Sequence, residues 1–432
     1  MEIKSFKGYR FSNDVVGNSA DCIAPPYDVI NDEQQEKLYQ QNEYNIVRVT
    51  KGKTAEFDEE GNNVYSRASD YFESWIESGA LKQDPENSIY AYVQSFEAQD
   101  KSYTRSGFIA LGKLAQFGKG VRPHEKTLDG PKADRLNLMR ATQAQFGQIF
   151  MLYDDPECIA DAIIAEAAKN QPLLSFVDDE NVTHSLYAIT GEANITDIAA
   201  MMADKDAVIA DGHHRYETAL NYFNETGKPE AAFRMMTFVN MHNEGLVILP
   251  THRLVGNLAD FDPKELKTKL SGDFDVTVYG KDKNTDKDQM FADLKKDFDQ
   301  AGISFGIYDN SGTFSRAVLK DIKSIQQVAD GLSEASQKLD VTVLHRLILE
   351  GILGINEQAL ASESNLEYIK DIGDAIDRSV ALVDSGEKQA VFFMNPTRIE
   401  QVQGVAAAGE KMPQKSTFFY PKIFTGLVIN KL

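Results

Sequence analysis

A run of chemically active residues follows an apolar segment near the middle of the chain, in the order Asp211-Gly212-His213-His214-Arg215. The apolar residues 207–210 predict a short buried strand, and residues 215–220 predict the first turns of a helix. A helix N-terminus offers free backbone N–H groups and a partial positive charge. With an arginine and two imidazoles beside it, this junction predicts an anion site, most naturally one for phosphate.

Each residue of this run has an expected role. Gly212 lets the backbone approach a ligand. His213, His214 and Arg215 are expected to bind the transferred phosphate, with the histidines taking part in catalysis and Arg215 in an exposed cleft. Asp211 suits a general base or a ligand for Mg²⁺ better than it suits anion binding. The alternative is that Asp211 only caps the helix and that the histidines pair with their neighbours.

Two further segments carry side chains suited to phosphate. Residues 122–136 mix four basic residues, a histidine and three acids around a Gly-Pro turn, and residues 410–422 carry lysines and hydroxyl groups. The alternatives are an ordinary charged loop for the first segment and an apolar strand that anchors the terminus for the second. The expected phosphate- and nucleotide-binding residues are His124, Lys126, Thr127, Lys132, Arg135, Lys415, Ser416 and Thr417.

The composition limits the partners of these segments. The chain has 432 residues, with 45 Lys and Arg against 66 Asp and Glu, so its formal net charge is −21. Because nucleic acids and anionic membrane surfaces attract basic faces, neither partner is expected. The cysteines Cys22 and Cys158 form no CxxC pair, which excludes zinc ribbons and dithiol redox motifs. The chain has no secretory h-region and no run of about 18 apolar residues, so a cytoplasmic protein is expected.

Strands and helices are expected to alternate along the whole chain, which predicts an α+β or mixed α/β fold. Apolar alternation predicts a strand over residues 44–50, and residues 89–96 and 104–111 predict a hairpin.

A change of composition after residue 255 predicts the domain organisation. The motif-bearing lobe is expected over residues 1–255, and the Lys- and Asp-rich residues 256–325 are expected to form an inserted or appended α+β lobe. Residues 326–432 are expected to return to the first lobe, because residues 412–422 carry phosphate-type side chains.

The chain resembles a bacterial and archaeal family known as domain of unknown function 1015. The segments that carry this resemblance occur in the family's order and span nearly the whole chain: Ala24–Val29, His124–Leu136, Ala210–Leu220, Leu249–Arg253 and Met412–Lys422.

Asp211-Gly212-His213-His214-Arg215 also looks like the signature of free serine kinases on the ParB/sulfiredoxin scaffold. This resemblance implies a ParB/sulfiredoxin-like core elaborated with an additional α+β lobe. It further implies phosphoryl transfer between a nucleotide and serine, or the reverse reaction, with ATP or ADP and Mg²⁺. In this chain, the counterpart of the essential acid of the free serine kinases would be Glu125 or Asp28.

Three functions follow from these observations. The first is phosphoryl transfer between a nucleotide and a small hydroxylated metabolite, with serine and phosphoserine as the leading pair and a place in serine biosynthesis. Lys126, Lys132 and Arg135 would then bind the rest of the nucleotide. The second is a phosphoserine phosphatase that needs no nucleotide. The third is a regulator that binds a nucleotide or metabolite without catalysis.

Overall fold

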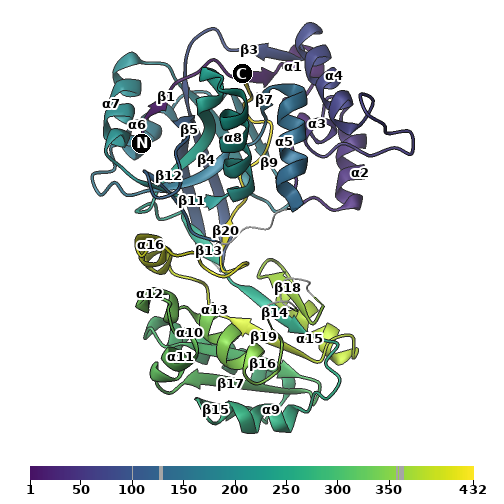
Figure 1. Ribbon diagram of the computed structural model, residues 1–432, viewed down its shortest axis with the longest axis vertical. Helices are drawn as coiled ribbons and strands as arrows, with labels where there is room; N and C mark the ends of the chain where they lie inside the picture. The colour runs from purple at the N-terminus through teal and green to yellow at the C-terminus, as the bar shows by residue number, and fades with distance from the viewer. Residues whose placement is uncertain (100, 126–129, 357–358, 360–363) are drawn as a thin grey trace. The chain divides into compact units, whose positions relative to one another are not determined.

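The computed structural model describes residues 1–432 except residue 100 and the ranges 126–129, 357–358 and 360–363 (Figure 1). The chain divides into two compact units. The first unit comprises residues 1–123, 127–247 and 421–432, and the second comprises residues 124–126 and 248–420. No helix among the described residues is both long enough and apolar enough to cross a membrane.

The first unit is built on a mixed sheet whose described strands run in the order β6-β11-β8-β12-β5-β4-β10-β9, with β1 paired to β5. The β12–β8 and β11–β6 ladders are parallel, and the other ladders are antiparallel. The strands are β1 (Ile3–Lys4), β4 (Ile89–Ala98), β5 (Lys101–Lys113), β6 (Val121–Pro123), β8 (Ile149–Tyr153), β9 (Leu174–Val177), β10 (Thr183–Ile189), β11 (Ala207–Asp211) and β12 (Phe233–Asn240).

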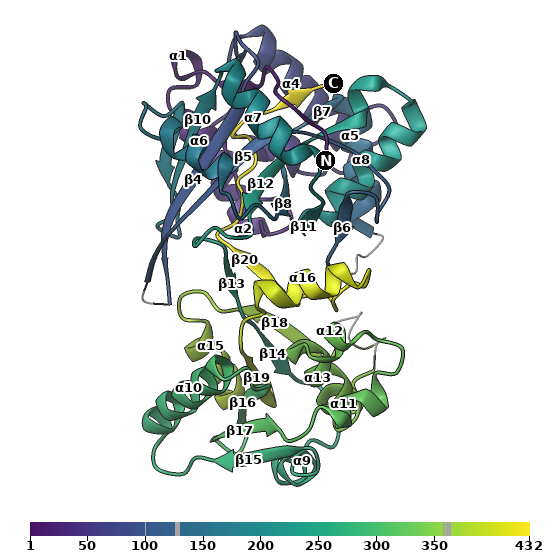
Figure 2. The same cartoon turned by 90° about the vertical axis from the view of Figure 1, so that its left-hand side faces the viewer.

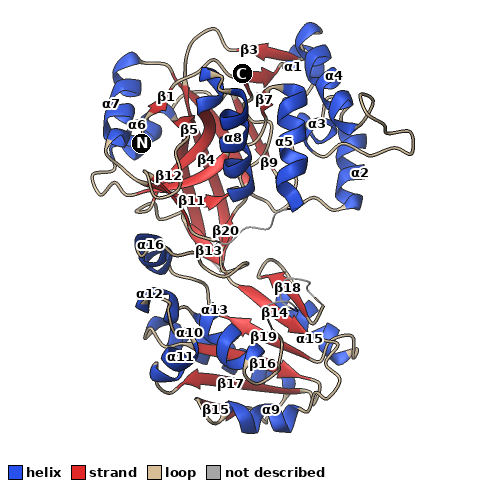
Figure 3. Ribbon diagram, viewed as in Figure 1, coloured by secondary structure: helices blue, strands red, loops and turns tan. Residues whose placement is uncertain are grey.

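Helices surround this sheet (Figures 1 and 3). They are α1 (Asn13–Val16), η1 (Ser19–Cys22), α2 (Asp32–Gln41), α3 (Val47–Thr50), α4 (Val64–Glu77), α5 (Gly130–Thr142), α6 (Ile159–Ala167), α7 (Glu192–Ala203), α8 (His213–Thr226) and η2 (Pro229–Ala232). Two small ladders join β2 (Tyr9–Phe11) to β3 (Leu81–Gln83) and β7 (Ala144–Gln145) to β21 (Asn430–Lys431). Every residue of β8 and β12 is buried, so both faces of the sheet are covered there.

The predicted hairpin of β4 and β5 is confirmed, and so is the mixed α/β class. The predicted strand over residues 44–50 is wrong, because residues 47–50 form helix α3. The Asn45 side chain accepts a hydrogen bond from the Val47 N–H group at 2.9 Å and donates to the Ile23 carbonyl at 3.2 Å. These bonds start a turn, and they override the strand preference of the β-branched residues.

The second unit contains an antiparallel sheet in the order β15-β17-β16-β19-β14-β18. Its strands are β14 (Thr251–Val255), β15 (Phe274–Val278), β16 (Ser304–Asp309), β17 (Thr313–Leu319), β18 (Leu366–Lys370) and β19 (Ala390–Met394), and β13 (Val247–Leu249) pairs with β20 (Phe418–Tyr420). Its described helices are α9 (Pro263–Leu270), α10 (Lys283–Asp299), α11 (Lys323–Val328), α12 (Glu334–Gln337), α13 (Asp340–Val343), the π-helix η3 (Leu344–Glu350), α15 (Ala375–Asp384) and α16 (Ile399–Ala407) (Figure 2).

The division between the units differs from the expected lobes. Strand β19 pairs with β16 on one side and with β14 on the other, so residues 256–325 share one hydrogen-bonded sheet with residues 366–394. The second unit therefore runs on to residue 420, and residues 421–432 alone of the C-terminal segment belong to the first unit. Composition could not indicate this, because strand pairing over such distances leaves no local signal.

A histidine inside the second unit makes its stability depend on pH. His345 lies on η3 with 9% of its surface exposed, and its Nε2 has no hydrogen-bond partner among the described residues. Burial, with smaller contributions from Arg253 and Arg346, lowers the pKa of His345 to about 3. In the unfolded chain the pKa of a histidine is about 6.5.

We expect the second unit to lose about 2 kcal/mol of stability through His345 between pH 7 and pH 5. The unfolded state binds the proton over this range and the folded state does not, so stability falls as pH falls below about 6.5. Denaturant unfolding at the two pH values measures the loss. His345→Leu should remove it, whereas His242→Gln, at a half-exposed histidine of the first unit, should not. An unchanged pH dependence in His345→Leu would contradict this assignment.

Candidate functional site

The predicted strand–turn–helix junction is present in the first unit. Strand β11 ends at Asp211 after a register shift against β8, and helix α8 begins at His213. Gly212 between them has φ 89° and ψ 29°, a left-handed conformation that favours glycine. A Cβ atom at Gly212 would lie 2.9 Å from Nε of Arg215, so a side chain there would displace the guanidinium group. Gly212 therefore serves both the turn and the placement of Arg215.

The start of helix α8 carries no side-chain cap among the described residues, and its N-cap is Gly212 itself. The first intrahelical bond at this end runs from the Tyr216 N–H group to the Gly212 carbonyl. The backbone N–H groups of the first turn therefore have no acceptor within the helix, which is the arrangement that binds anions at helix N-termini. The side chain of Asp211 does not cap the helix, which argues against the alternative that Asp211 is only a helix cap.

Two cations surround the carboxylate of Asp211. Nζ of Lys422 lies 2.8 Å from Oδ2, and Nη2 of Arg215 lies 3.7 Å from Oδ1. Burial alone would raise the pKa of Asp211, but the charges of Lys422 and Arg215 outweigh it and hold the pKa below its usual range. Asp211 is therefore ionised at neutral pH and is a weak base in this arrangement.

Lys422 reaches Asp211 because the C-terminal segment is fixed to the sheet of the first unit. The Lys422 carbonyl accepts a hydrogen bond from Gln94 on β4 at 3.0 Å, and the Pro421 carbonyl accepts one from the buried Arg105 on β5. Of the segment 326–432 that was expected to return to the first lobe, only residues 421–432 do so, and Lys422 is the residue that contacts Asp211.

His214 is the imidazole with an unused ring nitrogen. Its Nδ1 is buried and has no hydrogen-bond partner among the described residues. Burial lowers the pKa of His214, Lys132 and Arg215 lower it further, and Glu217 opposes them. His214 is therefore neutral at pH 7. His213 is buried at the first position of the same helix.

Arg215 is not the exposed cleft side chain expected from the sequence. Its side chain retains 10% exposure, and Nη1 donates to the Gln148 carbonyl. Of the other basic residues expected here, Lys132 pairs with Glu217 at 2.8 Å. Arg135 donates to the Thr50 carbonyl at 2.7 Å and lies 4.0 Å from the ring centroid of Tyr27.

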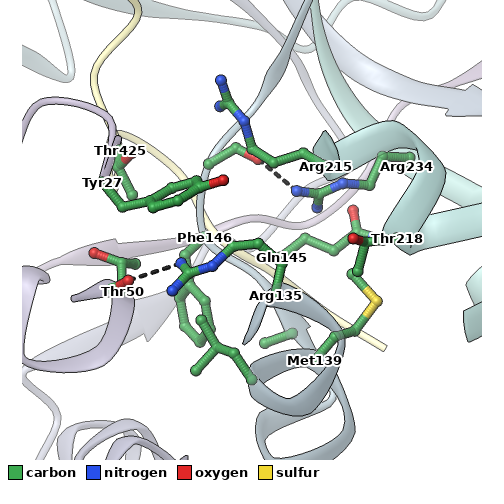
Figure 4. A pocket seen from close by; sticks show the side chains of 13 residues that line it. Tyr27, Thr50, Arg135, Met139, Gln145, Phe146, Arg215, Thr218, Arg234 and Thr425 are labelled. Carbon is green, nitrogen blue, oxygen red and sulfur yellow. Dashed lines mark hydrogen bonds between the residues drawn. The ribbon is translucent and has the colours of Figure 1, made fainter. Parts of the chain in front are cut away.

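A cavity of about 50 Å³ lies beside this junction within the first unit. Figure 4 shows Arg135, Arg215 and Arg234 around it, with Tyr27 and Thr50 on the opposite side from helix α8. Arg234 was not identified from the sequence. The available signal was an arginine within the otherwise largely apolar strand β12, whose residues are all buried. Thr218 and Thr425 add hydroxyl groups to the lining.

The remaining predicted residues belong to the second unit, where they contact one another. Nε2 of His124 lies 2.8 Å from Oγ1 of Thr417, and Glu125 accepts a hydrogen bond from the Lys415 N–H group at 2.6 Å. The Ser416 hydroxyl donates to the Pro413 carbonyl. The predicted residues Lys126 and Thr127 lie outside the described residues. The structure therefore brings the 124–125 and 415–417 segments together, and Lys132 and Arg135 stay with the first unit.

The surroundings of Asp211 do not suit a resident Mg²⁺ ion. Both oxygens of its carboxylate already face a cation, so a metal ion there would meet two positive charges. Among the described residues, no group of three or more His, Cys, Asp or Glu side chains is placed to share a metal ion. The predicted role of Asp211 as a Mg²⁺ ligand therefore does not fit this arrangement.

The fold and the site together define a mixed α/β protein with a cationic strand–helix junction beside an arginine-lined cavity. The chain belongs to the family described as "Protein of unknown function (DUF1015)", whose model matches residues 3–342. This family membership confirms the resemblance drawn from the sequence. No curated protein matches the chain.

Several solved structures are similar to the chain at low identity. A free serine kinase variant in complex with ADP is 11% identical, covers 74% of this chain and 92% of its own, and has a TM-score of 0.36. A free serine kinase in complex with AMP is 13% identical with the same coverage and a TM-score of 0.35. A conserved hypothetical protein from Pyrococcus furiosus is 14% identical, with 73% and 97% coverage and a TM-score of 0.33. The ParB/sulfiredoxin-like core stays a prediction.

Proposed function

We propose that the first unit catalyses phosphoryl transfer between a nucleotide and a small hydroxylated metabolite, with serine and phosphoserine as the leading pair. The observation that carries this proposal is the junction at Gly212. An uncapped helix start, Arg215 and the neutral imidazole of His214 meet there. The choice of serine rests on the resemblance of residues 211–215 to the free serine kinase signature.

The proposed reaction needs a cationic seat for the transferred group. Phosphoryl transfer depends mainly on positioning and on neutralising charge over the phosphoryl oxygens. The backbone N–H groups at the start of α8 and the guanidinium group of Arg215 would supply that seat. Lys422, held by Asp211 at 2.8 Å, adds a further positive charge at the same junction.

His214 is proposed as the base. The hydroxyl oxygen of the acceptor would form a bond to the terminal phosphorus of ATP or ADP, while the bond from that phosphorus to the bridging oxygen breaks. The hydroxyl proton would pass to Nδ1 of His214, which is neutral and has no partner among the described residues. The shortened nucleotide leaves with the bridging oxygen. Asp211 is then a positioning residue for Arg215 and Lys422.

The direct test is to incubate the full chain with L-serine, Mg²⁺ and either ATP or ADP and to measure phosphoserine and the shortened nucleotide. Equal amounts of the two products support phosphoryl transfer, and so does formation of ATP or ADP from phosphoserine in the reverse direction. Release of inorganic phosphate from phosphoserine without any nucleotide would identify a phosphatase instead. Nucleotide binding without any product would identify a regulator, and either result would contradict the proposal.

A further inference from the structure

The cavity beside the junction has an unusual charge distribution for a buried space. Three arginines, Arg135, Arg215 and Arg234, line it, and no acidic side chain is among the described lining residues (Figure 4). Its remaining polar groups include the hydroxyls of Tyr27 and Thr218, and its apolar wall includes Phe146 and Met139. A concave, partly apolar space with a few convergent polar groups is the usual form of a small-molecule site.

Arg234 is a buried arginine whose positive charge has no counter-ion among the described residues. It is 4% exposed, and its Nη2 donates to the Gly147 carbonyl at 2.7 Å. Its Nε and Nη1 are buried without a hydrogen-bond partner among the described residues, and no acidic group acts on its pKa. Burial and the neighbouring charge of Arg215 lower the pKa of Arg234 to about 9. A buried cation without a counter-ion is costly, so an anion that fills this position is strongly favoured.

The charges of the other two arginines are already balanced in part. Nε of Arg135 donates to Asp134 at 2.8 Å, and Arg215 faces Asp211 at 3.7 Å. Of the three lining arginines, Arg234 alone has no acidic partner among the described residues, so its single charge faces the cavity without a counter-ion. One charge matches a carboxylate, whereas a phosphate monoester carries between −1.5 and −2 near pH 7.

We propose that this cavity binds the carboxylate group of a small organic acid, with Arg234 as the counter-ion and Tyr27 and Thr218 contacting the body of the ligand. Arg215 both lines the cavity and pairs with Asp211, so it connects the carboxylate to the reacting end of the site. The role of this ligand as the phosphoryl acceptor rests on the proposed function, but its binding does not. The substrate class is thereby a small hydroxy or amino acid, and not a simple alcohol.

The test measures binding by calorimetry without nucleotide, with two matched pairs of probes. L-serine is compared with ethanolamine, which is serine without its carboxyl group. Glycerate is compared with glycerol, in which a hydroxymethyl group replaces the carboxylate. We expect L-serine or glycerate to bind the wild-type chain and its partner probe to bind at least tenfold more weakly. Inorganic phosphate should not compete. Equal binding within both pairs, or displacement of the bound acid by inorganic phosphate, would overturn the carboxylate assignment.

Arg234→Met should weaken binding of the acid about ten- to a hundredfold, because it removes a charged hydrogen-bond donor from a buried site. The matched control is Arg140→Met, which removes an arginine on α5 that pairs with Glu225 at the surface. If Arg234→Met does not fold, Met139→Phe, which fills the cavity and keeps every charge, should abolish binding. Unchanged binding in the folded variant would overturn the inference.

These outcomes separate the cavity from the reaction. Acid binding that depends on Arg234, in a protein that forms no phosphoserine, would contradict the proposed function and leave the cavity assignment standing. Phosphoserine formation with an unchanged KM for serine in Arg234→Met would contradict the cavity assignment and leave the proposed function standing.

Discussion

Asp211→Asn is expected to lower turnover about a hundredfold while phosphate-type ligands bind as tightly as before or several-fold more tightly. The carboxylate lies 2.8 Å from Lys422 and 3.7 Å from Arg215, so it fixes both cations at the junction. A displacement of about 1 Å in such groups can cost 10²-fold in rate. The amide keeps the shape of the side chain but removes a negative charge that repels an incoming anion.

The same substitution should also lower the free energy of unfolding by about 1–3 kcal/mol, because it leaves two cations without their counter-ion in a mostly buried place. Combining it with Lys422→Met should restore part of that loss, since a cation is removed together with the carboxylate. Asp206→Asn is the matched control, at a half-exposed carboxylate that pairs with Arg122 on the surface. Initial rates, anion titrations and denaturant unfolding measure the three effects. Wild-type turnover in Asp211→Asn would show that Asp211 and the junction have no catalytic function.

The junction at residues 207–215 was predictable from the sequence because its signals are local. Four apolar residues predict the buried strand, and a glycine before a helical pattern supplies the left-handed turn. The histidines and the arginine then follow at the helix start by their position alone. The backbone preferences and the positions of the charged residues indicate the same strand–turn–helix structure, so the sequence alone predicts this junction.

The arginine cavity could not be predicted, because it is assembled from residues that are distant in the sequence. Thr50 ends α3, Arg135 lies on α5, Arg234 lies on β12 and Thr425 belongs to the C-terminal segment. Of these residues, Arg135 alone belongs to a segment that the sequence analysis singled out. An arginine within a buried strand is a recognisable signal in retrospect, since it needs either a counter-ion or a ligand.

The contacts of the C-terminal residues 410–422 could not be predicted either, although their phosphate-type side chains were recognised in the sequence. Lysine and hydroxyl side chains made residues 415–417 look suited to phosphate, but Thr417 contacts His124 and Lys415 contacts Glu125 within the second unit. Lys422 is the residue that reaches Asp211, because Arg105 and Gln94 bind the neighbouring carbonyls across more than 300 positions of sequence. Side-chain chemistry alone could not distinguish Lys415 from Lys422.

His214→Gln is expected to have the largest effect on turnover, a loss of about 10²–10⁴-fold, which is the usual contribution of a positioned base. Glutamine is polar and similar in length, and it cannot accept the hydroxyl proton at neutral pH. Ligand binding should be retained, because the helix start and Arg215 are unchanged. The matched control is His242→Gln, at a half-exposed histidine that contacts Asp154 at 2.7 Å, and it should keep the wild-type rate.

The pH profile tests the same role independently of the size of the loss. Burial lowers the pKa of His214 below its ordinary value of 6.5, so the imidazole is in its basic form through the neutral range. The rate should therefore be constant above about pH 6.5 and should fall as the pH decreases through the lowered pKa, where protonation removes the base. The residual rate of His214→Gln should lack this acidic limb. If the acidic limb persists in His214→Gln, another group accepts the proton, and the assignment of His214 as the base is wrong.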